Sequence, residues 1–242
     1  MPQRKIKPVN NEFYHIVKKG IDDREIFLDD EDHFRFINSL LVFNDAAAAP
    51  WSLRAFWKQR APAALTRSNY KPKMPLLEIH TLCLMPNHFH LLVRQLTENG
   101  IALFMQKLGG YSWYFNKKYD RSGTLFQDRY KIVHIETDDQ LRNTFSYIHT
   151  NPISLIEAGW KERGVKDANR AIEFLENDYL WSSYQDYLEI ENFPSVITKN
   201  FFLEQLGGKE GVRKEIKSWI LFKSSTTPTT RPGGVVEKTW LE

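Results

Sequence analysis

Cysteine is almost absent from this chain of 242 residues, since Cys83 is the only one. An internal disulfide bond is therefore excluded, and so is a zinc site built from several cysteines. Internal repeats and long apolar runs are also missing, and the basic residues at the start lack the apolar core of a signal peptide. These absences predict a soluble protein of the cytoplasm without a membrane-spanning segment.

Charge of one sign is present in only slight excess. Lys and Arg number 33 against 30 Asp and Glu, so the formal net charge is +3 at pH 7. This mildly basic balance allows a nucleic acid as a partner but does not require one. The hydrophobic fraction of 42% is enough for a substantial core, and the aromatic fraction of 14% suits core packing or base stacking.

Residues 85–93 read MPNHFHLLV, in which two histidines flank one bulky apolar residue. Side chains alternate between the two faces of a β-strand, so His88 and His90 project from one face and Phe89 from the other. Residues two apart on a strand are about 7 Å apart at Cα, which lets two imidazoles converge on one small divalent ion. An isolated pair of this kind more often consists of packed core or edge histidines. The interpretation therefore depends on the rest of the chain.

Hydrophobic periodicity predicts an α+β fold with helices layered on an antiparallel sheet. Strands are expected at 13–18, 77–84 and 130–135 and in the histidine segment, and helices at 30–43, 101–115 and 138–157. Asp29 and Asp138 are the expected N-caps of the first and last of these helices. Pro152 should make the last helix irregular, and Gly159 should end it.

Composition divides the chain into three parts. Residues 1–165 are expected to form the main domain, 166–223 a helical extension, and 224–242 a disordered tail rich in Ser, Thr, Pro and Gly. Within the main domain, a stretch at about 44–75 contains aromatic and basic residues, the latter being Arg54, Lys58, Arg60, Arg67, Lys71 and Lys73. This stretch is either a long connector packed by its aromatic residues or a basic arm that follows a nucleic-acid backbone. The sequence favours neither interpretation.

The last predicted helix carries a second feature with chemical meaning. Asn143, Tyr147 and Asn151 are spaced four apart, so they share one helix face, distinct from the apolar stripe. A phenol and a carboxamide one turn apart could point at the same ion as the two histidines. Taken alone, a tyrosine at such a position is more often a residue at the boundary of the core.

Several motifs recur in an order that resembles a known family. They are MPNHFHLLV at 85–93, YFN at 114–116, GTLFQDRYK at 123–131 and YIHTNP at 147–152, supported by YHI at 14–16, IF at 26–27, DDED at 29–32 and WSSY at 181–184. Over about 12–190 the chain resembles the single-tyrosine transposases of the HUH superfamily, most of all their REP-associated branch. Two departures are the long basic stretch and the segment 153–159, ISLIEAG, where an Arg-Ala-Gly run is common. The second departure affects an expected DNA contact and not the chemistry.

The resemblance implies a ferredoxin-like antiparallel sheet and metal-assisted DNA strand transfer. On the matched positions, His88, His90 and Asn151 would bind magnesium or manganese, and Tyr147 would be the nucleophile. Attack would produce a covalent 5′-phosphotyrosine and a free 3′-hydroxyl, and the retained bond energy would allow rejoining without ATP. An ordinary tyrosine hydroxyl has a pKa of about 10, so the metal ion would be needed to polarise the phosphate.

The expected partner is single-stranded or hairpin DNA, because a tyrosine on a helix cannot reach into a stacked duplex. Five basic residues are the expected backbone contacts, Arg129 and Lys131 first and then Lys117, Lys118 and Arg121. The protein would then be associated with the nucleoid, as a monomer or a homodimer. Two other functions stay open at this stage: a metal-dependent nuclease that uses water as nucleophile, and a non-catalytic regulator that binds hairpin DNA.

Overall fold

The computed structural model describes residues 7–47, 71–127 and 129–225. At its centre lies a four-stranded antiparallel sheet in the order β2-β3-β1-β4. The strands are β1 (Phe13–Lys19), β2 (Leu77–Met85), β3 (His88–Gln95) and β4 (Lys131–Ile135). Helices connect β1 to β2 and β3 to β4, and a tight turn joins β2 to β3. This is the ferredoxin-like arrangement, so the predicted fold class is confirmed.

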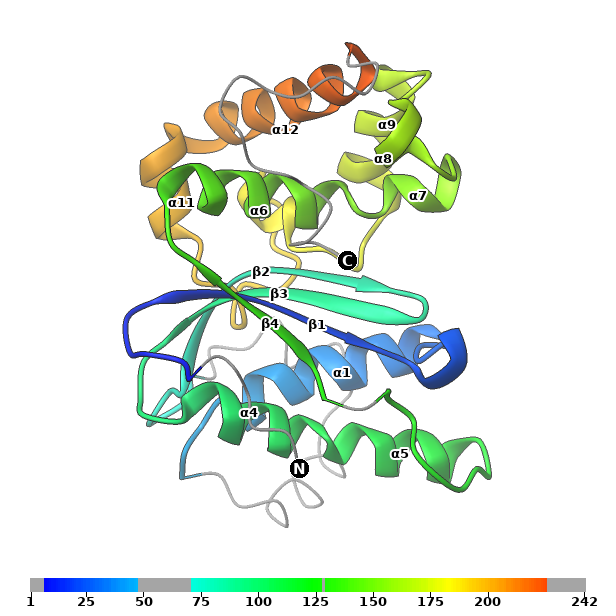
Figure 1. Ribbon diagram of the computed structural model, residues 1–242, viewed down its shortest axis with the longest axis vertical. Helices are drawn as coiled ribbons and strands as arrows, with labels where there is room; N and C mark the ends of the chain where they lie inside the picture. Colours follow the sequence, from blue (N-terminus) through cyan, green and yellow to red (C-terminus); the bar gives the residue numbers. More distant parts are fainter. Residues whose placement is uncertain (1–6, 48–70, 128, 226–242) are drawn as a thin grey trace.

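Helices cover both faces of the sheet (Figure 1). One layer contains α1 (Asp30–Phe43), α4 (Gly100–Leu108) and α5 (Gly110–Lys118). The other contains α6 (Asp138–Thr150), α7 (Ile153–Ile156), α8 (Trp160–Arg163), α9 (Ala168–Glu173), α11 (Asn200–Leu206) and α12 (Gly208–Ser225). The remaining short elements are η1 (Ile21–Asp23), η2 (Phe174–Asp178) and α10 (Tyr184–Tyr187).

Strand alternation decides which layer each side chain of β3 meets. The Phe89 ring lies 4.7 Å from that of Phe36 on α1. His90, one residue further, faces Tyr147 on α6. His88 and His90 lie on one face, as the alternation predicted, and α6 covers that face.

Helix boundaries differ from the sequence-based prediction in three places. The side chain of Asp29 caps α1 as expected by accepting the Asp32 N–H at 3.0 Å. The N-cap of α6, however, is Thr137, whose hydroxyl accepts the Gln140 N–H at 3.2 Å, so the assignment of Asp138 was wrong. The helix predicted over 101–115 is two helices, which part at adjacent glycines at 109 and 110. The helix predicted over 138–157 is interrupted next to Pro152, whose ring and missing N–H disfavour a continuous helix.

The WSSY motif at 181–184 lies along the free edge of β2. The Trp181 carbonyl accepts the Leu84 N–H at 2.9 Å, and the Ser183 N–H donates to the Leu82 carbonyl at 3.0 Å. These bonds cover an edge strand that would otherwise expose unpaired backbone groups. They also tie the segment between η2 and α10 to the central sheet.

The basic stretch leaves the fold and returns to it at one place. The Ala46 N–H donates to the Met74 carbonyl at 2.9 Å, and the Leu76 N–H donates to the Asn44 carbonyl at 3.1 Å. The chain between these paired ends, 48–70, lies outside the described residues, and with it most of the predicted arm. The tail expected to be disordered, 224–242, also lies outside them, except for Ser224 and Ser225 at the end of α12. None of the described helices has the length and apolarity needed to cross a membrane.

Candidate functional site

Three histidines meet on the face of the sheet below α6. The His88 Nδ1 lies 2.6 Å from Asn87 Oδ1, and because an amide oxygen can only accept, Nδ1 carries the proton. The lone pair of His88 is therefore on Nε2. His90 Nδ1 lies 2.9 Å from Nε2 of His15 on β1, while His90 Nε2 is buried without a hydrogen-bond partner among the described residues. With the proton on Nδ1, His90 also presents a lone pair on Nε2.

Burial keeps these imidazoles neutral. Desolvation, together with the positive charge of Lys161, lowers the pKa of His15 to about 3. The same two causes lower the pKa of His88 to about 4, and desolvation together with the other histidines lowers the pKa of His90 well below its usual value. Neutral imidazoles are the form that binds metal ions, so at pH 7 no proton has to leave before a metal ion binds.

Tyr147 approaches the histidines from α6. Its ring is edge-on to His90, with centroids 5.6 Å apart, and to His15, with centroids 6.0 Å apart. Its hydroxyl accepts a hydrogen bond from Lys161 Nζ at 3.1 Å. The residue is only 7% exposed, so little of Tyr147 meets the solvent.

Asn151 follows the last residue of α6 and is 1% exposed. Its Nδ2 donates to the Tyr147 carbonyl at 3.2 Å, which turns Oδ1 the other way. Oδ1 accepts a hydrogen bond from Lys161 Nζ at 3.0 Å. Because Tyr147 and Asn151 are four residues apart, their side chains lie on the same helix face, and both accept a hydrogen bond from Lys161.

The donor atoms present here suit a divalent metal ion. His88 Nε2 and the orphaned His90 Nε2 are neutral nitrogen donors, and Asn151 Oδ1 is a neutral oxygen donor. Imidazole favours manganese over magnesium, and an amide oxygen is acceptable to both. Within residues 7–47, 71–127 and 129–225, no group of three or more His, Cys, Asp and Glu side chains could hold a metal ion.

Of the five predicted DNA contacts, Lys131 has the closest relation to the site. Val17 on β1 pairs with His90 on one side and with Lys131 on the other. Residues directly opposite in an antiparallel pair share a face, so Lys131 projects toward the same side as His90. Two strand spacings amount to about 10 Å. Lys131 is exposed, as is Arg129 two residues before it.

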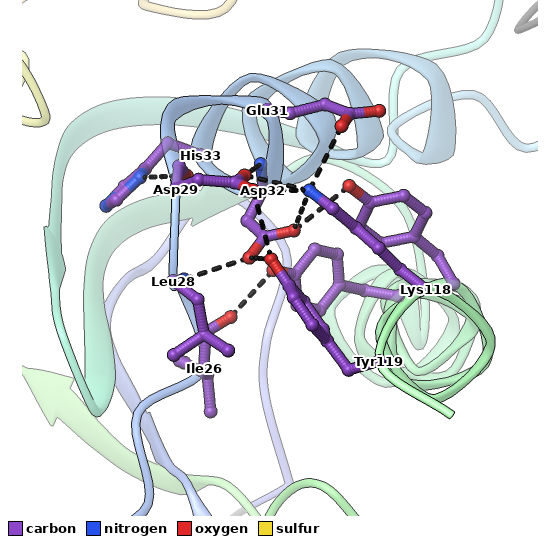
Figure 2. A network of polar contacts seen from close by, with 10 residues as sticks. Ile26, Leu28, Asp29, Glu31, Asp32, His33, Lys118 and Tyr119 are labelled. Carbon is purple, nitrogen blue, oxygen red and sulfur yellow. Dashed lines mark hydrogen bonds and ion pairs between the residues drawn. The ribbon is translucent and has the colours of Figure 1, made fainter. Parts of the chain in front are cut away.

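Lys118 is instead engaged by carboxylates of α1 (Figure 2). Its Nζ lies 2.8 Å from Asp29, 3.0 Å from Glu31 and 3.0 Å from Asp32. Burial opposes the ammonium charge, but hydrogen bonds to these carboxylates raise the pKa of Lys118 above its usual value. These ion pairs connect α5 to the start of α1. The expected DNA contacts that remain are the other four residues. Among them, Lys117 lies 5.2 Å from the Trp113 ring, and Arg121 donates to Asn116 Oδ1 at 2.8 Å.

Two residues of the site were not assigned a role from the sequence. His15 lies between apolar residues of β1, and a polar residue on the buried face of a strand was the available signal. Lys161 had no such signal, because it is one lysine among 33 Lys and Arg residues. A turn after α7 brings it to the site.

Residues 62–151 match the family of IS200-like transposases. This segment includes His88, His90, Tyr147 and Asn151, so the resemblance inferred from the motifs is confirmed over the part of the chain that holds the candidate site.

Among solved structures, the chain is similar to a REP-associated tyrosine transposase bound to a REP hairpin. The sequences are 13% identical, the TM-score is 0.47, and the similarity covers 83% of this chain and 93% of the other. None of the curated proteins matches the chain.

Proposed function

We propose that this protein cleaves and rejoins single-stranded DNA next to hairpins, with Tyr147 as nucleophile and a divalent metal ion held by His88, His90 and Asn151. The observation that carries the proposal is the position of Tyr147. Its ring lies edge-on to His90, and its hydroxyl shares one ammonium with the Asn151 oxygen. His90 therefore supports the proposal from one side of Tyr147 and Asn151 from the other, and His88 is the ring neighbour of His90 on the same strand.

In the proposed reaction, Tyr147 Oη attacks the scissile phosphorus. The Oη–P bond forms and the bond from phosphorus to the 3′ oxygen breaks, which leaves a 5′-phosphotyrosine and a 3′-hydroxyl. The phenol proton passes to water, and the leaving 3′ oxygen takes one from water. A bound magnesium or manganese ion supplies Lewis-acid polarisation of the phosphate. His88, His90 and Asn151 would hold that ion, and α6 positions Tyr147 beside His90.

DNA is the proposed partner because the segment that holds the site is of the transposase type. The strand would lie over β4 and the end of α5, where Arg129, Lys131, Lys117 and Arg121 would contact phosphates. Because Tyr147 is nearly buried, a flexible single strand fits this site better than a stacked duplex.

The test uses labelled single-stranded hairpins from the genomic surroundings of the coding sequence, incubated with the full chain and manganese. A denaturing gel should show a shortened strand and a protein–DNA adduct. Tyr147→Phe should abolish both, while hairpin affinity stays within about threefold, because only the attacking oxygen is lost.

The same gel separates the two alternatives. Cleavage without an adduct, retained in Tyr147→Phe, would identify a nuclease that uses water. Hairpin binding without manganese-dependent cleavage would identify a non-catalytic regulator. Either result would overturn the assignment of Tyr147.

A further inference from the structure

Lys161 is a cation that the fold places on the proposed nucleophile. Its Nζ lies 3.1 Å from Tyr147 Oη, 3.0 Å from Asn151 Oδ1 and 4.6 Å from the centroid of the Tyr147 ring. An ammonium has three donors, and Tyr147 and Asn151 take two of them within the described part of the chain. The third is available for an oxygen of a substrate phosphate.

The short helix α8 holds this lysine in place. Gly159, at φ +74°, makes the turn into α8, and an added Cβ there would lie 2.6 Å from the Arg163 guanidinium. Trp160 is 1% exposed and anchors the helix in the core. The turn at Gly159 and the buried Trp160 thus fix where Lys161 leaves the backbone.

We propose that Lys161 is a further catalytic residue of the strand transfer. Its ammonium holds Tyr147 Oη in the attacking position and stabilises the negative charge that develops on the phenol oxygen and the phosphate. This inference rests on the proposed function. Lys161 keeps its proton throughout: the Oη–P bond forms, the bond to the 3′ oxygen breaks, and the protons are exchanged with water.

The same position gives Lys161 a second, opposite effect. A fixed positive charge beside His88 and His90 repels a divalent cation, and its hydrogen bond occupies one lone pair of Asn151 Oδ1. Removing the ammonium should therefore slow cleavage and tighten metal binding at once. A loss of local structure would weaken both.

The first experiment compares Lys161→Met with Lys166→Met, which removes the same charge from an exposed position nearby. In Lys161→Met, the single-turnover rate of adduct formation at saturating manganese should fall about 100-fold, as when one transition-state donor is removed. The affinity for manganese, measured by electron paramagnetic resonance without DNA, should rise at least about fivefold. Lys166→Met should change neither quantity.

A chemical rescue distinguishes charge from shape. Lys161→Cys introduces a thiol that bromoethylamine converts to a side chain ending in an ammonium at nearly the length of lysine. The natural Cys83 is fully buried, and burial raises the pKa of its thiol, so alkylation is confined to the introduced position. The alkylated protein should recover at least about tenfold in rate relative to the unmodified variant.

A rate in Lys161→Met equal to that of the natural protein would overturn the inference, as would a slow variant whose manganese affinity is unchanged and whose rate alkylation does not restore. These results differ from a failure of the proposed function. If the natural protein forms no adduct, Tyr147 is not the nucleophile. If it forms one and Lys161→Met forms it equally fast, only the role of Lys161 is wrong.

Discussion

The imidazoles of His15 and His90 are joined Nε2 to Nδ1 at 2.9 Å across the neighbouring strands β1 and β3. Their ring planes are only 15° apart. This bond orients the His90 ring and, with the proton on Nδ1, directs the lone pair on Nε2 away from β1. Partners of this kind commonly set the affinity of a metal site although they do not touch the metal.

His15→Phe should therefore weaken manganese binding by about 10- to 100-fold while preserving the ring volume in the core. The measurement is calorimetric titration of the full chain with manganese, together with the midpoint of thermal unfolding. His134→Asn, on β4, serves as the control because His134 stacks on Tyr14, which projects from the opposite face of the sheet. Equal manganese affinities in the His15→Phe variant and the natural protein would show that His15 only fills space.

Tyr111 is another tyrosine that could be considered as the nucleophile, and its surroundings in the structure argue against that role. It is 1% exposed, its hydroxyl donates to the Ile26 carbonyl at 2.7 Å, and burial raises its pKa above the usual value. Tyr111→Phe should leave the covalent adduct intact and lower the free energy of unfolding by about 1 kcal/mol, because one buried hydrogen bond is removed. Absence of the adduct in a folded Tyr111→Phe variant would contradict the assignment of Tyr147.

Acid should destabilise the fold through its buried histidines. Desolvation lowers the pKa of His149, which is hydrogen-bonded to Ser183 Oγ, to about 3. In the unfolded chain the group titrates near its usual value of about 6.5, so below that pH the unfolded state binds more protons than the folded state. The contribution to stability is present above pH 6.5 and is lost as the pH falls toward 3. Each such histidine contributes about 1.4 kcal/mol per pH unit in that window.

The measurement is urea unfolding in EDTA at several pH values for the natural protein and for His149→Gln. The slope of the free energy of unfolding against pH should be smaller in the variant by the contribution of one histidine. Burial raises the pKa of Asp186 to about 7, and this group acts in the opposite direction, so only the difference between the two proteins isolates His149. Parallel slopes would mean that His149 is not a buried neutral group.

Local patterns in the sequence were sufficient for most of the fold. Alternation identified every strand of the sheet, and the spacing of Tyr147 and Asn151 identified their shared helix face. The N-cap of α6 was predicted wrongly because two adjacent residues could each fill that position. Thr137 and Asp138 are both good caps, and only the backbone conformation shows that Thr137 is extended and Asp138 helical.

Contacts between distant segments could not be read from the sequence. Lys118 resembles any exposed lysine until α5 is packed against α1 and its ammonium meets the carboxylates of Asp29 and Asp32. Lys161 reaches Tyr147 only because α7 and the turn at Gly159 reverse the chain. In both cases the partners are 10 or more residues away, where side-chain periodicity carries no information.

Asp32 should be a major contributor to stability. It is fully buried and accepts hydrogen bonds from Leu28 N–H at 2.9 Å, Tyr119 at 2.7 Å and Lys118 at 3.0 Å. Asp32→Ala would leave the Leu28 N–H without its acceptor and would remove the buried carboxylate from Lys118 and Tyr119, which keep only Asp29 and Glu31 nearby, so it should lower the free energy of unfolding by about 3–5 kcal/mol. Glu31→Ala removes an exposed carboxylate from the same lysine and should cost less than about 1 kcal/mol. Urea midpoints that fall equally in both variants would refute the claim that Asp32 contributes more to stability than Glu31.

The basic stretch can be tested because its ends are joined. The Ala46 N–H donates to the Met74 carbonyl at 2.9 Å, so replacing 48–70 with a short Gly-Ser linker should not pull α1 away from β2. A second variant keeps the stretch and its aromatic residues but neutralises its basic side chains, Arg54, Lys58, Arg60, Arg67, Lys71 and Lys73.

If the stretch is a DNA arm, both variants should show a flatter dependence of hairpin affinity on salt. Each phosphate of a single strand that the protein no longer neutralises should reduce the slope of log affinity against log salt by about 0.7. Cleavage of bound DNA should continue, because none of these residues is among the proposed catalytic groups. If the stretch is a connector packed by Trp51, Phe56 and Trp57, neutralisation should leave the slope unchanged, while replacement by the linker should lower the midpoint of thermal unfolding. The salt slope of the neutralised variant therefore decides between the two interpretations, since that variant retains every aromatic residue of the stretch.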